Sequence, residues 1–487
     1  MAISPRLVRA LGWCALTLAG MAVVFLPFAV LERAQAALTG LAVTAVVSGF
    51  LGGIAVAGTH GVSMVAGATP ALRLSLLGWF LVPLLAAPPL IVASGSWVTG
   101  LFESYSAMTT TGAVLLPPEE LSRTLVMWRT AIAWIGGLAN LVLAATVFAA
   151  LDRRGVGLRR TSLLTVERSD LFTNFGRATQ RLGLVYACIT VFGTFAFLLT
   201  GTPPYEALSL AMAGVSTSGL QPVSGPLEQF LNVPGVMVLA LLCLSGAWNM
   251  AVQYEALTRL RTTRGSGELR AMIAIAVALG AVAALLNGAS SFAVTVFDAI
   301  FALTTSGFQT AGSVGLPSAV LILLAMLGGS TISTSGGIKM PRALLLARRA
   351  GGELSVLSHP SAAIRTRYAG RSVSDEALTG VWVYALAFPA VLGLGAVAIG
   401  FTGASFEEAL MISGASITNT GPIAAEQWAG QSAFGLLTAS ILMILGRLEI
   451  LAAAAAIYVL LVRDSALHGC SAAKPWLGKN PNCFAGP

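Results

Sequence analysis

Long apolar segments separated by short polar stretches run through most of this chain. The first two, Leu11–Leu31 and Ala37–Ala57, are each long enough to cross a bilayer as one helix, because about 20 apolar residues span the hydrocarbon core. Four similar units follow, each with a long apolar segment, a short one, a polar loop and a second long one. The short segments cannot cross a membrane, so we expect half-helices that enter it and turn back.

These segments predict ten spans and four re-entrant half-helices. The entering helices are expected near residues 74–94, 182–200, 271–287 and 378–400, the half-helices near 97–108, 204–215, 292–303 and 405–416, and the exiting helices near 124–151, 232–256, 316–346 and 432–462. The predicted division is 1–60 for two N-terminal transmembrane helices, 72–152, 178–258, 268–349 and 376–463 for pore repeats 1 to 4, and 464–487 for a polar cytoplasmic tail.

The four polar loops share one pattern, an apolar residue followed by three small polar residues and glycine. The copies are Met108–Gly112, Val215–Gly219, Leu303–Gly307 and Ile417–Gly421. Acids recur at fixed distances before the glycines: Glu103 and Asp298 nine residues before, Glu206 and Glu408 thirteen residues before. Matches of this kind indicate an internal repeat, and a repeat sets the fold. We therefore expect two N-terminal helices and four pseudo-repeats of helix, pore loop and helix around one central pore.

Composition agrees with an all-α polytopic membrane protein. The 487 residues are 56% hydrophobic and 10% charged, with a mean hydropathy of +0.84, whereas soluble domains carry about 25% charged residues. A signal peptide is an alternative for the first apolar run, which follows Arg6 and Arg9. That run is longer than the roughly 7–15 apolar residues of a signal peptide, so we expect a retained helix.

The net charge of +8 raises the alternative of nucleic-acid binding, but the placement of the basic residues favours topology. With the N-terminus inside, only Arg33, Arg123 and Arg129 fall on the outer side, and Lys339 and Arg447 fall within helices. All other basic residues among the 28 fall in cytoplasmic segments, as the positive-inside rule requires. Outer acids such as Glu119, Glu228 and Glu426 serve solubility or form a negative vestibule that concentrates cations.

The four loops predict a cation filter. Non-helical backbone at membrane depth is tolerated only where protein buries it or where it lines water. Four such loops around one axis form a ring of carbonyl oxygens, which can replace the hydration shell of a monovalent cation. Packing of small residues between helices is the alternative, but it explains neither the hydroxyl triplets nor their fourfold recurrence. The predicted potassium ligands are Thr110, Thr111, Gly112, Thr217, Ser218, Gly219, Thr305, Ser306, Gly307, Asn419, Thr420 and Gly421.

Two features of the exiting helices stand out. Residues 328–337 are Gly, Ser or Thr except for Ile332, and a continuous helix is disfavoured there because each Gly costs about 1 kcal/mol relative to Ala. A break or a packing kink is expected. Arg447 lies near the middle of the last span, where a charge must face water or carbonyl groups. It either raises the barrier to cations beside the pore or pairs with Glu449 or Glu255, whereas Lys339 can extend toward the cytoplasmic surface.

Three further stretches carry a family resemblance: Trp128–Gly137, Gly328–Lys339 and Leu445–Glu449. With the four loops, they make nearly the whole chain resemble the membrane subunit of Trk-type bacterial potassium uptake systems, in the wider Trk/Ktr/HKT superfamily. The loops depart from the commonest family pattern at Gln221 and Gln309, which bears on ion preference. The resemblance implies a movable intramembrane loop that obstructs the pore, and the predicted gate residues are Gly328, Gly329, Ser330, Gly336, Gly337, Lys339 and Arg447.

The same resemblance implies partners and a location. Members work as homodimers on cytoplasmic nucleotide-binding regulatory subunits that respond to NAD or ATP, in the bacterial inner membrane. Both termini are then cytoplasmic, and the arginine-rich loops at 153–181 and 342–371 could dock that partner or serve topology alone. In the superfamily, serine in place of the first-loop glycine goes with sodium permeation, so Gly112 favours potassium. A sodium-coupled or sodium-conducting relative remains the alternative.

Other function classes are disfavoured. The sequence has no G-x-x-x-x-G-K-[ST] loop for ATP, no H-E-x-x-H and no G-x-S-x-G, so direct ATP use and intramembrane hydrolysis are not expected. Its three histidines show no metal spacing, and its five cysteines form no C-x-x-C. We expect no enzyme activity and no bound cofactor, only K⁺ as the transported ion. A membrane enzyme or scaffold is the rival class, and passive conduction and proton coupling both remain open.

Overall fold

The computed structural model describes residues 4–62, 68–153, 175–259, 267–310, 316–359, 366–368, 371–448, 450 and 454. The arginine-rich residues 154–174, Glu449 and the predicted tail 464–487 lie outside the described residues. The described part is almost entirely helical. It also contains two antiparallel strands of two residues each, β1 (Arg367–Tyr368) and β2 (Arg371–Ser372). The predicted all-α membrane fold with its four pseudo-repeats is confirmed by this arrangement.

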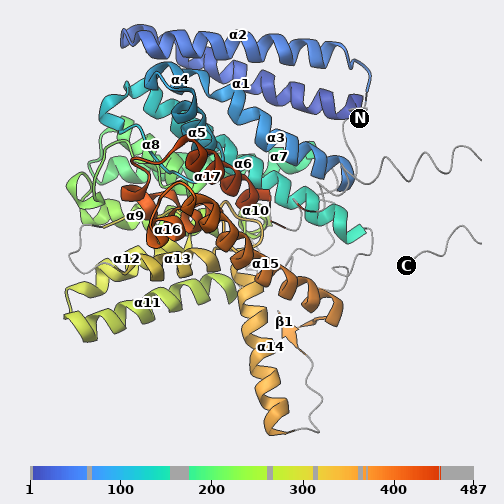
Figure 1. Cartoon of the computed structure of the whole chain (residues 1–487), viewed down its shortest axis with the longest axis vertical. Helices are drawn as coiled ribbons and strands as arrows, with labels where there is room; N and C mark the ends of the chain where they lie inside the picture. Colours follow the sequence, from blue (N-terminus) through green and yellow to red (C-terminus); the bar gives the residue numbers. More distant parts are fainter. Residues whose placement is uncertain are drawn as a thin grey trace, which may run out of the picture.

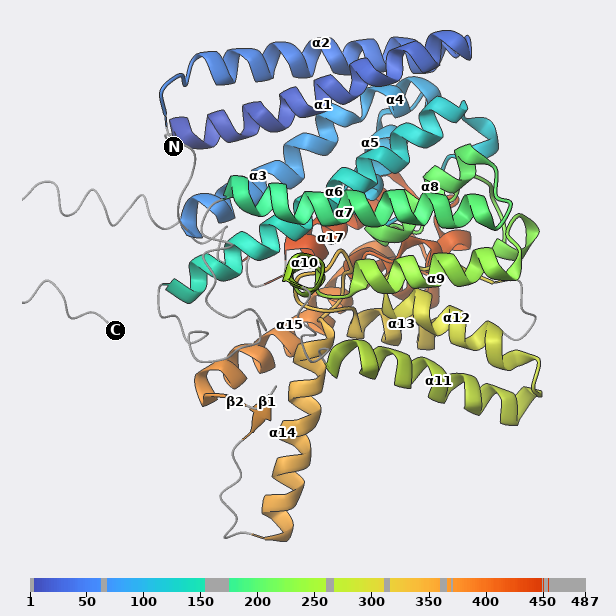
Figure 2. The same cartoon turned by 180° about the vertical axis from the view of Figure 1, so that it is seen from behind.

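Two N-terminal helices, α1 (Pro5–Leu31) and α2 (Gln35–Ala57), pack on each other along one edge of the molecule (Figures 1 and 2). Many of their large apolar side chains are exposed, including Val24, Leu31 and Phe50. In a bilayer such side chains face lipid, which is as apolar as they are. The two helices therefore form an outer wall and leave the polar interior to the repeats.

Each repeat contains an entering helix, a half-helix and an exiting helix. The entering helices are α3 (Ala68–Ala86) with α4 (Pro88–Ser94), then α7 (Phe175–Leu199), α11 (Gly267–Asn287) and α15 (Asp375–Gly400). The half-helices are α5 (Trp97–Met108), α8 (Pro204–Ser216), α12 (Ser291–Leu303) and α16 (Phe406–Thr418). The exiting helices are α6 (Arg123–Arg153), α9 (Val233–Ala247) with α10 (Met250–Arg259), α13 (Ser318–Leu327) with α14 (Met340–Ser358), and α17 (Ala433–Leu448). Short 3₁₀ turns η1 (Pro118–Glu120), η4 (Leu227–Gln229) and η5 (Gly421–Gln427) follow three of the loops.

Six helices are long and apolar enough to cross a membrane, and two bent pairs raise the number to eight among the described residues. The remaining two predicted spans are α17 and the pair α13–α14, which is interrupted between Leu327 and Met340. The pair α9–α10 bends by 98°, where the sequence predicts one helix. The bend is held because Met250 N donates to Ile332 O (2.9 Å) and Asn249 Oδ1 accepts from Ala251 N (3.1 Å).

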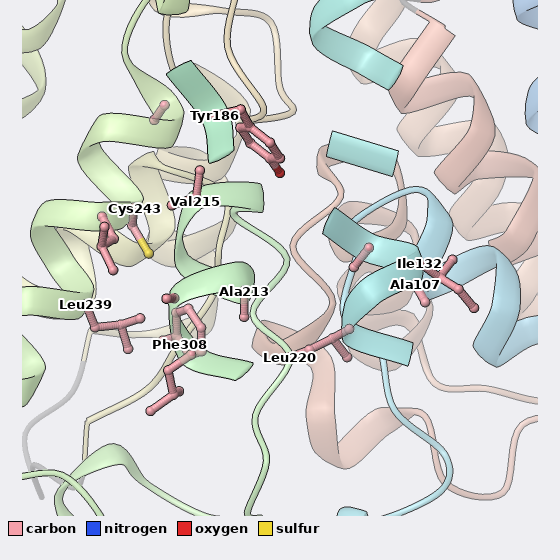
Figure 3. Close-up of a cluster of buried hydrophobic side chains, with 14 of the residues drawn as sticks. Ala107, Ile132, Tyr186, Ala213, Val215, Leu220, Leu239, Cys243 and Phe308 are labelled. Carbon is pink, nitrogen blue, oxygen red and sulfur yellow. The ribbon is translucent and has the colours of Figure 1, made fainter. Parts of the chain in front are cut away.

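One hydrophobic cluster supports the half-helices from outside. Figure 3 shows Ala213 and Val215 of α8 beside Leu239 and Cys243 of α9, with Phe308 close by. All five side chains are at most 2% exposed. Helix α14 projects away from this body, across the direction of α1 and α11 (Figure 2). The core thus fixes the half-helix ends, and these ends carry the predicted site.

Candidate functional site

All four half-helices end in the same turn. The residue two positions before the glycine adopts a left-handed conformation in every repeat, with φ of 51° at Thr110, 51° at Thr217, 57° at Thr305 and 55° at Asn419. The next residue donates its N–H to the carbonyl five positions back, as Thr111 does to Ser106 O (2.8 Å). This is the Schellman helix end, which normally uses glycine at the left-handed position. Threonine is strained there, so its occurrence in three of the four repeats, with Asn419 in the fourth, indicates a constrained site.

The glycine loops, residues 109–112, 216–219, 304–307 and 418–421, meet in a closed ring. A Cβ on Gly112 would lie 1.8 Å from Ser218 O in the second loop, and one on Gly219 would lie 2.0 Å from Ser306 O in the third. A Cβ on Gly307 would lie 2.9 Å from Cγ2 of Thr420 in the fourth loop. The fourth loop returns to the first, because Gly421 N donates to Thr111 O (2.7 Å). The predicted ligand residues of all four repeats are therefore brought together in cyclic order.

The fourth loop departs from the backbone geometry of the other three. Gly112, Gly219 and Gly307 have positive φ, as a glycine turn requires, but Gly421 is not among the positive-φ glycines and begins η5 before Pro422. Gly421 therefore does not form the positive-φ turn of the other three loop glycines. Gly421 is needed for close approach, since a Cβ there would lie 2.2 Å from Ala113 N.

Glycines on the exiting helices allow the loops to sit against them. A Cβ on Gly136 would lie 1.9 Å from Met108 O, and Gly246 and Gly446 have the same relation to Val215 O and Ile417 O, both at 2.3 Å. Each carbonyl belongs to the apolar residue that opens the loop. Sequence reasoning did not assign this role, although one of these glycines stands 24 to 27 residues after the loop glycine in repeats 1, 2 and 4. In repeat 3, Gly336 lies against Thr418 O instead.

The interrupted segment, Gly328–Lys339, is held against the ring and the α9–α10 bend. Ser330 N donates to Ala247 O (2.8 Å) and Thr334 N to Gly246 O (3.0 Å). Gly336 N donates to Thr305 Oγ1 (2.7 Å), a predicted filter residue. The structure therefore places the predicted gate residue Gly336 against the third loop and Ser330 against the end of α9. Lys339 does not extend to the surface, because it is 6% exposed and its Nζ donates to Ser335 O and Ser333 Oγ.

Arg447 connects the first loop to the interrupted segment. Its Nε donates to Thr109 O, its Nη1 to Thr334 O and its Nη2 to Thr110 Oγ1, and the residue is 3% exposed. Among the described residues, every hydrogen bond found for Arg447 goes to a carbonyl or hydroxyl oxygen and none to a carboxylate. The predicted alternative of a pair with Glu255 is not observed. Arg447 directly follows Gly446, and in repeats 1 and 2 the corresponding residues are Gly137 and Ala247.

The recurring acids have structural roles in three repeats. Glu206 and Glu408 occupy the third position of α8 and α16, where carboxylates stabilise the positive end of a helix. Glu408 also completes a capping box with Ser405. Glu103 accepts from Leu115 N (2.5 Å) and Leu116 N (2.8 Å) and pairs with Arg129 at 3.1 Å. Arg129 is buried near the start of α6, within the exiting helix that the sequence predicts.

The segments that follow the first and second glycine loops are hydrogen-bonded to each other outside the ring. Ser224 donates its N–H (2.8 Å) and hydroxyl (2.7 Å) to Glu119. The Ser224 hydroxyl and backbone N–H lower the pKa of Glu119, because both stabilise its charged form. Among the described residues, no group of three His, Cys, Asp or Glu side chains could hold a metal ion. The oxygens of the ring are carbonyl and hydroxyl oxygens, the donor class of weakly held alkali cations.

The sequence is similar to those of known cation transport proteins. The family TrkH, described as "Cation transport protein", matches residues 83–273 and 269–468. The Trk system potassium uptake protein TrkH of Halomonas elongata is 27% identical over 399 residues, covering 77% of this chain and 82% of the relative. TrkG of Escherichia coli strain K12 is 28% identical over 397 residues, covering 76% and 81%.

A solved structure supports the same fold. The crystal structure of the potassium transporter TrkH from Vibrio parahaemolyticus matches with a TM-score of 0.81 at 23% identity, covering 94% of this chain and 99% of that one. The family is one of transporters and not of enzymes. Its match extends over more than half of the sequence and includes all four glycine loops. The chain therefore belongs to the TrkH family of cation transport proteins.

Proposed function

We propose that this protein takes up potassium ions through the ring of glycine loops, which acts as the selectivity filter. The observation that carries the proposal is the closed cyclic order of the four loops, from Gly112 through to the Gly421–Thr111 hydrogen bond. One chain then encloses one pore. The names of the relatives, potassium uptake proteins of Trk systems, support potassium as the ion.

The chemistry of the ring suits a monovalent cation. Its twelve predicted ligand residues are Thr, Ser, Asn and Gly, so the loops offer many dipoles and no carboxylate. A cation bound only by dipoles is held weakly enough to leave, which conduction requires. All four half-helices also end at the ring, and the C-terminal end of a helix carries partial negative charge. The fold therefore concentrates a modest negative potential without fixed charge.

The gate in this proposal is the interrupted segment together with Arg447. Gly336 contacts the third loop, and Arg447 holds both Thr109 of the first loop and Thr334 of the segment. A buried positive charge at this place opposes cation passage while the contacts last. Movement of the segment away from Thr305 and Arg447 would open the path.

The proposed location is a bacterial inner membrane, with both termini in the cytoplasm because the basic loops gather on that side. The proposed assembly is a homodimer on a cytoplasmic nucleotide-binding regulatory subunit. Arg348 and Arg349 belong to α14, which projects away from the body that contains the loops (Figure 2). They offer positive charge to an acidic partner.

The test is rubidium uptake by the purified full chain in proteoliposomes, with sodium as competitor. Potassium transport predicts saturable uptake that potassium suppresses at far lower concentration than sodium does. Equal suppression by sodium would favour the sodium-conducting alternative, and absence of uptake would overturn the proposed function. Repeating the measurement with an imposed proton gradient separates passive conduction from proton coupling.

A further inference from the structure

A cavity of about 270 Å³ opens beside the third glycine loop. Its lining combines half-helix α12, the chain that leaves the third loop and the turn η5 after the fourth. The lining includes Asp298, Gly307, Phe308, Gln309, Glu426 and Gln427. The cavity therefore joins a loop glycine to two acidic side chains. It lies on the face from which the half-helices enter, since Thr310, three residues past Gly307, returns to Asp298.

Asp298 and Glu103 occupy the same position in repeats 3 and 1, nine residues before the loop glycine. Both hold the chain that leaves the loop: Glu103 accepts from Leu115 N and Leu116 N, and Asp298 Oδ1 accepts from Thr310 N (3.2 Å) and Thr310 Oγ1 (2.7 Å). The two carboxyl groups therefore have the same structural role, but their electrostatic environments differ.

Glu103 is neutralised and Asp298 is not. Arg129 of α6 pairs with Glu103 at 3.1 Å. Among the described residues, no basic side chain forms an ion pair with Asp298. The nearby charges are also acidic, Glu228 and the exposed Glu426 of the cavity lining. The cavity lining therefore contains two carboxyl groups and no basic side chain, a composition that attracts cations when the carboxyl groups are ionised.

We infer that Asp298 draws a hydrated monovalent cation into this cavity at the outer mouth of the ring, and so sets the concentration at which uptake is half-saturated. This inference rests on the proposed function. Negative clefts raise the local concentration of cations, and low-dielectric walls strengthen the effect. Asp298 is 7% exposed, so protein surrounds most of its carboxyl group and solvent screens it less than it screens Glu426.

The experiment is initial rubidium uptake by full-length protein in proteoliposomes across a range of external rubidium concentrations. Asp298→Asn removes the charge and keeps an oxygen that accepts from Thr310. We expect the half-saturating rubidium concentration to rise by roughly three- to tenfold, with little change in maximal rate, and the difference to shrink at high concentrations of an impermeant salt.

Two matched variants separate charge from structure. Asp298→Glu keeps a carboxylate on a side chain one methylene longer, so its half-saturation should stay nearer to wild type than that of Asp298→Asn. Glu426→Gln removes an exposed, better screened charge and should have a smaller effect than Asp298→Asn. Unchanged half-saturation in a folded Asp298→Asn protein, or an equal shift in a folded Asp298→Glu protein, would overturn the inference while leaving the proposed function intact. Absence of uptake by the wild-type chain would overturn both.

Discussion

The backbone N–H of Gly421 donates to the carbonyl oxygen of Thr111 at 2.7 Å, and this bond joins the last glycine loop to the first. Asn419 reinforces the junction, because its Nδ2 donates to Thr111 Oγ1 at 3.0 Å. The ring thus closes within one chain. Its shape depends on loop-to-loop contacts that leave no space for a methyl group.

The first prediction is that Gly112→Ser weakens discrimination between potassium and sodium more than it lowers the amount of folded protein. A side chain at Gly112, with φ of 73°, is strained and would collide with Ser218 O. The second loop must move, and the carbonyl ring widens or tilts. The measurement is rubidium uptake with increasing sodium.

The control for this change is Gly53→Ser in α2, where an added Cβ meets no atom within 4 Å. It should retain wild-type selectivity and yield. A folded Gly112→Ser protein with unchanged selectivity would remove the filter assignment from the first loop.

The half-helices were predictable because each depends on local composition. Half-helix α5, predicted at 97–108, spans Trp97–Met108, and α8 and α12 differ from prediction by one residue at one end. The capping box of Ser405 and Glu408 can likewise be read from the spacing. Four copies of one pattern made these assignments stronger than a single copy would.

The parts that could not be predicted depend on contacts between distant residues. The left-handed residue at each half-helix end is Thr or Asn, although propensity favours Gly, because loop packing overrides local preference. Glu103 and Arg129 are 26 residues apart, and their pairing follows only once α5 and α6 are packed. The carbonyl partners of Arg447 and the buried orientation of the Lys339 side chain likewise depend on packing between segments.

A second prediction concerns the interrupted segment. Deleting residues within Ser330–Ser335 should raise basal rubidium flux several-fold, because the obstruction beside the ring is shortened. Thr334→Ala is the milder variant: it removes the hydroxyl, which lies 3.0 Å from both Val215 O and Gly246 O, and it keeps the bond from Thr334 N. It should raise flux less. Lower flux from folded protein in both variants would show that the segment supports the ring and does not obstruct it.

A third prediction concerns stability outside the ring. Arg129→Met leaves Glu103 charged and buried without its partner, which should destabilise the protein by about 3–5 kcal/mol. The double variant Glu103→Gln with Arg129→Met should be more stable than the single one, because no unpaired charge remains. Apparent Tm in detergent measures both. Wild-type stability in Arg129→Met would contradict the pairing.

The fourth prediction is that Arg447→Ala raises rubidium flux per folded molecule by roughly tenfold, a barrier lower by about 1.4 kcal/mol. The physical reason lies in its partners. Arg447 donates to Thr109 O and Thr334 O, so its loss removes a positive charge from the ring and releases the interrupted segment from the first loop. Selectivity should change little, since the contacts between loops remain.

Arg447→Lys tests charge and connection separately. Lysine keeps the positive charge, but its single ammonium group cannot reproduce the fixed fork of a guanidinium that reaches both carbonyls. If charge alone restrains cations, Arg447→Lys should conduct like wild type. If the connection to Thr334 restrains the segment, Arg447→Lys should conduct nearly as fast as Arg447→Ala. Flux per folded molecule is measured beside thermal stability in detergent, because a destabilised Arg447→Ala protein with wild-type flux would show that this arginine serves folding and does not control the pore.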